Sequence, residues 1–228
     1  PMQSPKIHRE VLRFLSELNE NNNREWFEAN SDTYQKARQQ MTIFCDTLAQ
    51  ALLLHDQVLP PKYFRIYRDL RFSKDKTPYK PHFAASFARD GAHLRGGYYL
   101  RIRPGESFVA CGFWNPNKED LYRIRKELET DAADFREVLS NASLKKSWGG
   151  LKGESVKTAP KGFDREHPDI DLIRHKQFIF VRSFSDGEVL ESGFLDKVDR
   201  CYRDIRPFFD LMSDILTTDL NGQSLLDQ

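Results

Sequence analysis

The sequence predicts an α+β fold in which an antiparallel β-meander sheet packs with N-terminal and C-terminal helices. Two changes of hydrophobic period support this prediction. Before about residue 53 and after about residue 194, apolar residues recur every three or four positions, as on a helix face. Between about residues 63 and 114, they alternate with polar residues, and glycines separate the alternating runs. We therefore expect helices to flank a central sheet along the chain.

The N-terminal fifth is predicted to be helical. A first helix is expected over about Pro5–Asn21, because Ser4 precedes a proline and apolar residues then follow with helical spacing. Asn23 is expected to cap a short turn. Ser31 is expected to cap a longer helix whose apolar stripe continues to Leu52.

The central region is predicted to be a series of strands. From Tyr63 to Phe72 the period is two, with Phe64, Ile66, Leu70 and Phe72 on the apolar face. Glycine-rich turns then divide the following strands. These strands are expected over residues 83–87, 98–102 and 108–114.

The C-terminal half alternates between helical signals and one strand signal. Asn115 followed by Pro116 is expected to open a helix, and Phe135 is expected to lie in a second one. The remaining expectations are a long loop over 145–162, a short helix from Pro168, a strand over 177–184, and helix over 194–216 with a break at Pro207.

Composition predicts one folded domain over residues 1–228, ordered from about residue 4 to 217 and followed by a polar C-terminal tail. Apolar residues make up 39% of the chain, which is enough to build a core. The 35 basic and 34 acidic residues give a net charge of +1, so no global field favours nucleic acid or anionic lipid. Any anion site must therefore be local.

The location expected from the sequence is the cytoplasm. Cys45, Cys111 and Cys201 are far apart and lie among apolar residues, as reduced core cysteines do. No apolar run has the length of a membrane helix, and the first ten residues lack the pattern of a signal peptide. We expect no membrane partner, and the sequence carries no signal for an oligomeric state.

The most informative segment runs from Arg65 to His82. Arg68 falls on the apolar face of the predicted strand, where a charged side chain needs a partner. The partner is a carboxylate from a packed helix, or an anionic ligand beside the sheet. A bulge that turns Arg68 outward is the third interpretation.

The loop that follows, from Ser73 to Pro81, is longer than a hairpin usually needs, and such length often accompanies binding. Pro78 and Pro81 stiffen it, so that basic side chains would bind phosphate or carboxylate with little loss of entropy. The alternative is a solvated charged hairpin. The predicted ligand-binding residues are Arg65, Arg68, Arg71, Ser73, Lys74, Lys76, Tyr79 and Lys80.

Four segments resemble one known family. They are NNNREWFEANSDTYQKAR at 21–38, RIYRDLRFSKDKTPYKPHF at 65–83, GGYYLRIRPGESFVACGFWNP at 96–116 and APKGFDREHPDIDLIRHKQFIF at 159–180. The chain is similar through them to the domain-of-unknown-function family 2461. The RFSKDK and PYK motifs are the most specific part. The resemblance implies a one-domain bacterial or fungal protein and assigns no activity.

Other candidate sites have simpler interpretations. Asp171 and His175 are four residues apart, as in half a metal site, but no third ligand follows at a recognisable spacing, so a surface ion pair is preferred and no metal is predicted. The strand-to-helix transition at Trp114–Pro116 is expected to be an ordinary cap. Trp26 is expected to pack in the core.

Three functions remain open. No serine-hydrolase elbow, P-loop, dinucleotide fingerprint or paired CxxC is present, and no cofactor is predicted. The first hypothesis is a site for a small anionic ligand; in a catalytic version, Asp69 or His82 would move the proton. The second is a structural or protein-interaction domain with an internal ion-pair network. The third is a nucleic-acid-binding module, which the near-zero net charge disfavours.

Overall fold

The computed structural model describes residues 4–226 and confirms the α+β fold class. Five antiparallel strands form one sheet in the order β1-β2-β3-β4-β5, so each strand pairs with its neighbour in sequence. This is the predicted meander. The strands are β1 (Lys62–Tyr63), β2 (Phe83–Ala88), β3 (Gly97–Ile102), β4 (Ser107–Phe113) and β5 (Phe178–Phe184).

The chain divides into two compact units. The first comprises residues up to 88, 99–109 and 183–199, and the second comprises 89–98, 110–182 and the residues from 200 onward. Strands β3, β4 and β5 contribute residues to both units. The candidate segment from Arg65 to His82 lies wholly in the first unit.

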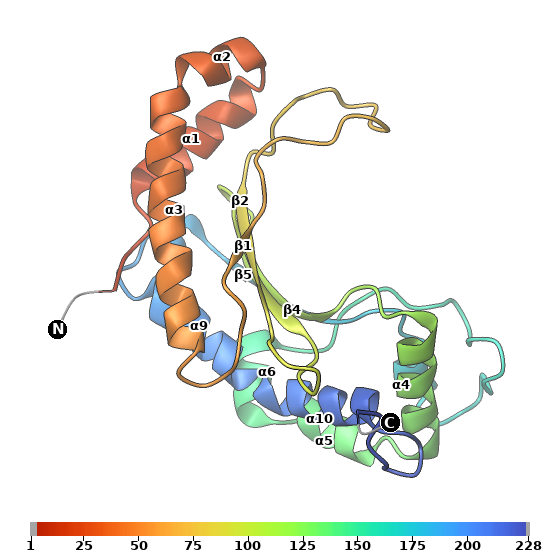
Figure 1. Ribbon diagram of the computed structural model, residues 1–228. Helices are drawn as coiled ribbons and strands as arrows, with labels where there is room; N and C mark the ends of the chain where they lie inside the picture. The colour runs from red at the N-terminus through yellow and green to blue at the C-terminus, as the bar shows by residue number, and fades with distance from the viewer. Residues whose placement is uncertain (1–3, 227–228) are drawn as a thin grey trace. The chain divides into compact units, whose positions relative to one another are not determined.

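Three helices precede the sheet in the first unit: α1 (Arg9–Glu20), α2 (Arg24–Ala29) and α3 (Ser31–Leu52), drawn in red and orange in Figure 1. Helix α1 packs on α3, and α3 packs on β2. The apolar stripes predicted from the sequence form this core, because Phe14, Leu18, Phe44 and Phe83 are buried.

The helix caps follow the prediction in one place and depart from it in another. The Asn23 side chain accepts a hydrogen bond from the amide of Trp26 and caps α2, as expected. Ser31 was expected to cap α3, but it is the first residue of that helix, and the cap position belongs to Asn30. The prediction was wrong because α2 ends so close to α3 that one residue joins them.

The predicted strand over 63–72 is also wrong, since β1 ends at Tyr63. Beyond it the chain forms the long loop, golden in Figure 1, that extends past the ends of β1 and β2. Its two arms pair irregularly, through one bridge between Tyr67 and Tyr79. The amide of Arg68 donates to the carbonyl of Pro78, but proline has no amide hydrogen with which to return the bond, so a regular ladder ends there.

A shift of register lies between β1 and this bridge. From Tyr63 to Tyr67 one arm advances by four residues, while the facing arm, from Ala85 to Tyr79, uses six. The two extra residues form a bulge near His82. The predicted apolar face also fails: Ile66 is buried, whereas Phe72, which lies beyond the bridge between Tyr67 and Tyr79, is 94% exposed.

The second unit is mostly helical. It contains α4 (Lys118–Thr130), α5 (Ala133–Leu139), α6 (Ala142–Trp148), α7 (Ile170–Ile173) and α10 (Arg206–Thr217). Helix α10 packs on α4 and α5, and α4 packs on α7. Gly112 in β4 has a φ of 122°, and a Cβ at this position would collide with the carbonyl oxygen of Phe178 in β5. Only glycine fits there.

The boundaries of the remaining helices agree with the prediction in part. The break at Pro207 is confirmed, because α9 (Phe194–Asp204) ends before α10 begins. The loop predicted over 145–162 is wrong at its start, where α6 continues to Trp148. Helix α8 (Asp186–Val189) was not predicted, although Ser185 and Glu188 form a capping box. In residues 4–226, no helix is both long and apolar enough to cross a membrane.

Candidate functional site

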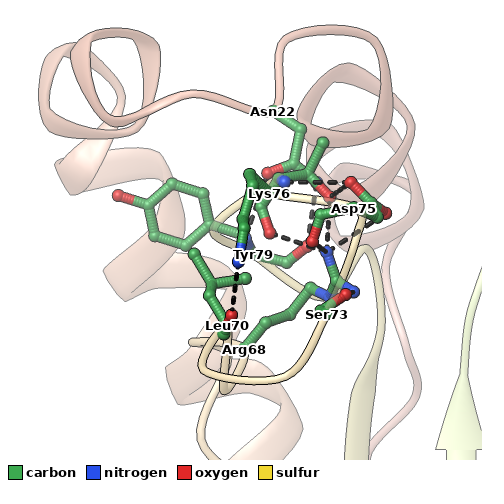
Figure 2. Close-up of polar contacts among 8 residues, drawn as sticks. Asn22, Arg68, Leu70, Ser73, Asp75, Lys76 and Tyr79 are labelled. Carbon is green, nitrogen blue, oxygen red and sulfur yellow. Dashed lines mark hydrogen bonds and ion pairs between the residues drawn. The ribbon is translucent and has the colours of Figure 1, made fainter.

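The tip of the 65–82 loop is held by Arg68. Its Nη1 atom donates to the carbonyl oxygen of Thr77 (2.8 Å) and to the Thr77 hydroxyl (2.8 Å), and its Nη2 atom donates to the Ser73 hydroxyl (3.2 Å). Nη1 also lies 3.1 Å from a carboxylate oxygen of Asp75. Arg68 therefore has the carboxylate partner that the sequence required, supplied by its own loop rather than by a helix (Figure 2).

The other charges of the tip are also used within the loop. Arg71 makes a bidentate contact with Asp69, in which Nη2 and a carboxylate oxygen are 2.7 Å apart. The hydrogen bonds from Arg71 hold the pKa of Asp69 below its usual range. The ammonium group of Lys76 donates to the carbonyl oxygen of Leu70 (2.8 Å). We call Arg68, Asp69, Arg71, Asp75 and Lys76 the tip network.

The loop is attached to the helices by a residue that sequence reasoning missed. The Asn22 side chain donates to the carbonyl oxygen of Tyr79 (2.8 Å) and accepts from the amide of Tyr79 (3.0 Å), as a neighbouring strand would. The Tyr79 ring stacks on Phe27 of α2, with centroids 4.1 Å apart. Asparagines at a helix end ordinarily signal a cap, so nothing in the sequence pointed to this clamp.

A partly open cavity of about 410 Å³ lies between the clamped loop and helices α2 and α3. Arg24, Glu28 and Gln35 line it from the helices, and Tyr67 and Tyr79 line it from the loop. The Tyr79 ring points away from the contact between Arg68 and Asp75 (Figure 2). The cavity borders the tip network through Arg68, which lines it, whereas the other four members of the network do not.

The base of the loop gathers positive charge. Burial lowers the pKa of Lys80, and the nearby charges of Arg65 and Arg101 lower it further. The Lys80 ammonium donates to the carbonyl oxygen of Arg65 (2.7 Å), and Nε of Arg101, in β3, donates to the Tyr99 hydroxyl (3.0 Å). We call Arg65, Lys80, His82 and Arg101 the basal cluster.

His82 lies in the bulge at the centre of this charge. Burial lowers its pKa to about 4, and the charges of Arg101, Lys80 and Arg103 contribute in the same direction. Its imidazole is therefore neutral at pH 7. The Nδ1 atom is buried and has no hydrogen-bond partner among residues 4–226. Most buried ring nitrogens have a hydrogen-bond partner, so this atom is available to a group other than the protein.

A family model described as "Conserved hypothetical protein (DUF2461)" matches residues 10–211. The chain belongs to this family. The match includes the tip network, the basal cluster and the cavity residues, so all three lie within the part shared with DUF2461. Searches of curated proteins and of solved structures returned no match.

The structure of this DUF2461 member divides the residues predicted from the sequence into two groups. Arg68, Ser73 and Lys76 meet at the tip, and Lys80 and His82 meet at the base. Lys74 is exposed. Arg101 was missed, although the alternation Tyr98, Leu100, Ile102 already placed it on the face of β3 opposite the core.

The other candidates stay outside this region. Asp171 and His175 were expected to pair, but Nη2 of Arg136 lies 2.7 Å from Asp171, while Nδ1 of His175 lies 2.9 Å from the carbonyl oxygen of Gln177. Helix α7 ends at Ile173, before His175, so Asp171 and His175 do not lie on one helix face. In the described part of the chain, no three His, Cys, Asp or Glu side chains gather as a metal ion requires.

Helix α4 begins with an ordinary cap, as expected, although the capping residue is Asn117 rather than Asn115. The Asn117 side chain accepts a hydrogen bond from the amide of Asp120 (2.8 Å). Trp26 is half-buried and stacks on Phe14, with centroids 6.0 Å apart. Neither residue joins the tip network or the basal cluster.

Proposed function

We propose that this protein binds a small anionic ligand, with a phosphate or carboxylate group, at the basal cluster. One observation carries the proposal: Lys80, Arg65 and Arg101 lie at the base of the loop, and none of the three has a carboxylate partner within ion-pair distance among residues 4–226. Burial lowers the pKa of Lys80, and the charges of Arg65 and Arg101 lower it further. Uncompensated like charges destabilise a fold, and they are often retained where a ligand supplies the opposite charge.

In the tip network, by contrast, the arginines have carboxylate partners. Arg68 and Arg71 lie in the same loop, and each has an aspartate partner. The sequence therefore provides counter-charges where the loop needs them, and it provides none beside Lys80. Arg103, the next basic residue beyond Arg101 in the chain, also has a partner, since its Nε atom lies 2.8 Å from Glu106.

The basal cluster offers the groups that hold an oxyanion. Arg101 has guanidinium donors beyond the one that contacts Tyr99, and Lys80 has donors beyond the one that contacts Arg65. An anion would offset their mutual repulsion. It would also favour protonation of His82, whose buried Nδ1 atom would then become a donor.

A catalytic version of the proposal assigns proton transfer to His82 rather than to Asp69. Asp69 is held by Arg71 in a bidentate contact, which stabilises its charged form and weakens it as a base. The arginines of the basal cluster would stabilise negative charge that develops during a reaction. Nothing in the site selects one reaction over another.

Calorimetric titration with inorganic phosphate at low ionic strength tests the proposal. We expect wild type to bind, and we expect Lys80→Met and Arg101→Met to lose at least tenfold in affinity, since each charge-assisted hydrogen bond contributes about 1.5–3 kcal/mol. Lys74→Met is the matched control, because it removes the same charge from an exposed position of the loop. Equal affinity in all four proteins would contradict the proposal.

The tip network supports the second candidate function, a structural or protein-interaction domain with internal ion pairs. Four hydrogen bonds from Arg68 and the bidentate Arg71 contact organise the loop without any ligand. If phosphate, acetate and other small anions all fail to bind wild type, this function becomes the better one. Binding of a single-stranded oligonucleotide that weakens steeply with salt would instead favour the nucleic-acid module.

A further inference from the structure

The cavity between the loop and helices α2 and α3 is lined by Tyr79, whose hydroxyl is open to solvent. Tyr79 is only 4% exposed, and its ring is fixed by the stack on Phe27 and by the two hydrogen bonds between its backbone and the Asn22 side chain, one in each direction. Its hydroxyl has no hydrogen-bond partner among residues 4–226. Because Tyr79 lines the cavity, a ligand there can replace water as the hydrogen-bond partner of this hydroxyl.

Other polar side chains around the cavity are exposed to solvent and are likewise not bonded by the protein. Arg24 and Glu28 are four residues apart on α2, yet they do not form an ion pair, and neither has another partner in the described part of the chain. The Gln35 side chain lies on the adjacent wall, from α3, and it also makes no hydrogen bond within residues 4–226. The cavity thus offers a planar cation, a planar anion and an amide, each able to bind two neighbouring ligand groups.

The charges of the cavity cancel. Arg24 and Glu28 contribute one charge of each sign, and the Arg68 guanidinium is already matched by Asp75. Either sign of ligand charge would therefore meet one attractive and one repulsive group. This arrangement favours a ligand that is uncharged and presents both donors and acceptors.

One wall of the cavity is aromatic. Tyr67 is 52% exposed, and its ring packs beside Tyr79 with centroids 5.5 Å apart. An exposed ring gives a flat apolar surface for the C–H face of a ligand, while the polar groups opposite bind its hydroxyls. The volume of about 410 Å³ is in the range of sites for small organic ligands.

We infer that the cavity lined by Glu28, Gln35, Tyr67 and Tyr79 binds a neutral polyhydroxylated ligand, a mono- or disaccharide. Vicinal hydroxyls both donate and accept, so they match a carboxylate, an amide and a phenol together. The site is separate from the basal cluster, and it does not depend on the proposed anion binding.

The test is saturation-transfer difference NMR of the full chain with glucose, galactose, mannose and cellobiose. We expect at least one of them to bind wild type, and we expect Tyr79→Phe and Glu28→Gln each to weaken that binding about 3- to 10-fold, as the loss of one hydrogen bond does. Because the Tyr79 hydroxyl has no protein partner, Tyr79→Phe should leave the melting temperature unchanged.

Tyr63→Phe is the matched control. The Tyr63 hydroxyl donates to Asp46 and lies 3.1 Å from the carbonyl oxygen of Thr42, and it lies outside the cavity. Its removal should lower the melting temperature and leave sugar binding intact. The inference is overturned if none of the four sugars binds, or if Tyr79→Phe and Glu28→Gln bind as wild type does. It is also overturned if the cavity instead takes glycine or phosphate in a manner that requires Arg24.

Discussion

The tip and the base of the 65–82 loop differ in how their positive charges are balanced. At the tip, Arg68 contacts Asp75, and Arg71 contacts Asp69. At the base, Lys80 lies near Arg65 and Arg101 and has no carboxylate partner among residues 4–226. The sequence RIYRDLRFSKDKTPYKPH looks like one basic run. At its tip the arginines have carboxylate partners, whereas at its base the cations have none among residues 4–226.

This difference separates a structural role from a binding role. Cations that already have partners lose those contacts when they bind a ligand, whereas cations that repel one another gain from it. The tip network therefore shapes the loop, and the basal cluster is the proposed anion site.

The largest effect is expected at the tip. Arg68→Met removes four hydrogen bonds and leaves Asp75 without its cation, so we expect a loss of about 1–3 kcal/mol in the free energy of unfolding. Chemical denaturation measures this loss. Hydrogen exchange should show that the loop opens first. Wild-type stability in Arg68→Met would mean that the tip network does not hold the loop.

The second effect is a pKa change at the base. The pKa of His82 is about 4 because the imidazole is buried among cations, and a bound anion offsets those charges. Saturating phosphate should therefore raise the pKa of His82, as followed by NMR titration of its ring protons. Lys80→Met should raise this pKa even without phosphate. A pKa that phosphate leaves unchanged would place the anion elsewhere.

The third effect is a pH dependence of stability. His82 has a lower pKa in the folded chain than in the unfolded chain, where it is near 6.5, so the unfolded state takes up the proton first as the pH falls. His82 therefore contributes stability that is present above pH 6.5 and is lost as the pH falls toward 4.

His82→Gln should flatten this part of the stability curve, measured by denaturation at several pH values. His93→Gln is the control, because His93 is exposed and belongs to the other unit. An identical slope in wild type and His82→Gln would show that the imidazole is not protected from protonation.

The smallest effect is the response to charge removal at low salt. Arg71 is largely exposed, so Arg71→Met should leave the melting temperature unchanged. Lys80→Met loses one hydrogen bond but relieves repulsion, so it should stay within about 0.5 kcal/mol of wild type. Added sodium chloride should stabilise wild type more than Lys80→Met, because salt screens the repulsion that only wild type retains.

Much of the fold follows from the sequence alone. The alternation in residues 83–113 predicted β2, β3 and β4 within a few residues, and the helical stripes predicted α1, α3 and the break at Pro207. These signals are local, because the spacing of apolar residues, every second position in a strand and every three or four positions in a helix, can be recognised within one short segment. The family resemblance, which was predicted from four segments of the sequence, was confirmed by the family model that matches residues 10–211.

The sequence also identified the segment that carries the candidate site, but it could not arrange it. The predicted strand over 63–72 has the right alternation and yet does not form, because Pro78 on the facing arm cannot return a hydrogen bond and the bulge near His82 shifts the register. A register is a property of two strands together, and one strand read alone does not contain it.

Tertiary structure alone decided which charges are balanced. Arg68 needed a partner by its position in the sequence, but only the turn of the loop brings Asp75 to it. Arg101 lies in β3 and Lys80 precedes β2, and the pairing of these two strands brings Arg101 near enough to influence the pKa of Lys80. The clamp by Asn22 on Tyr79 joins residues 57 positions apart. Composition and period determine which elements form, whereas ion pairs depend on distances that only the folded chain sets.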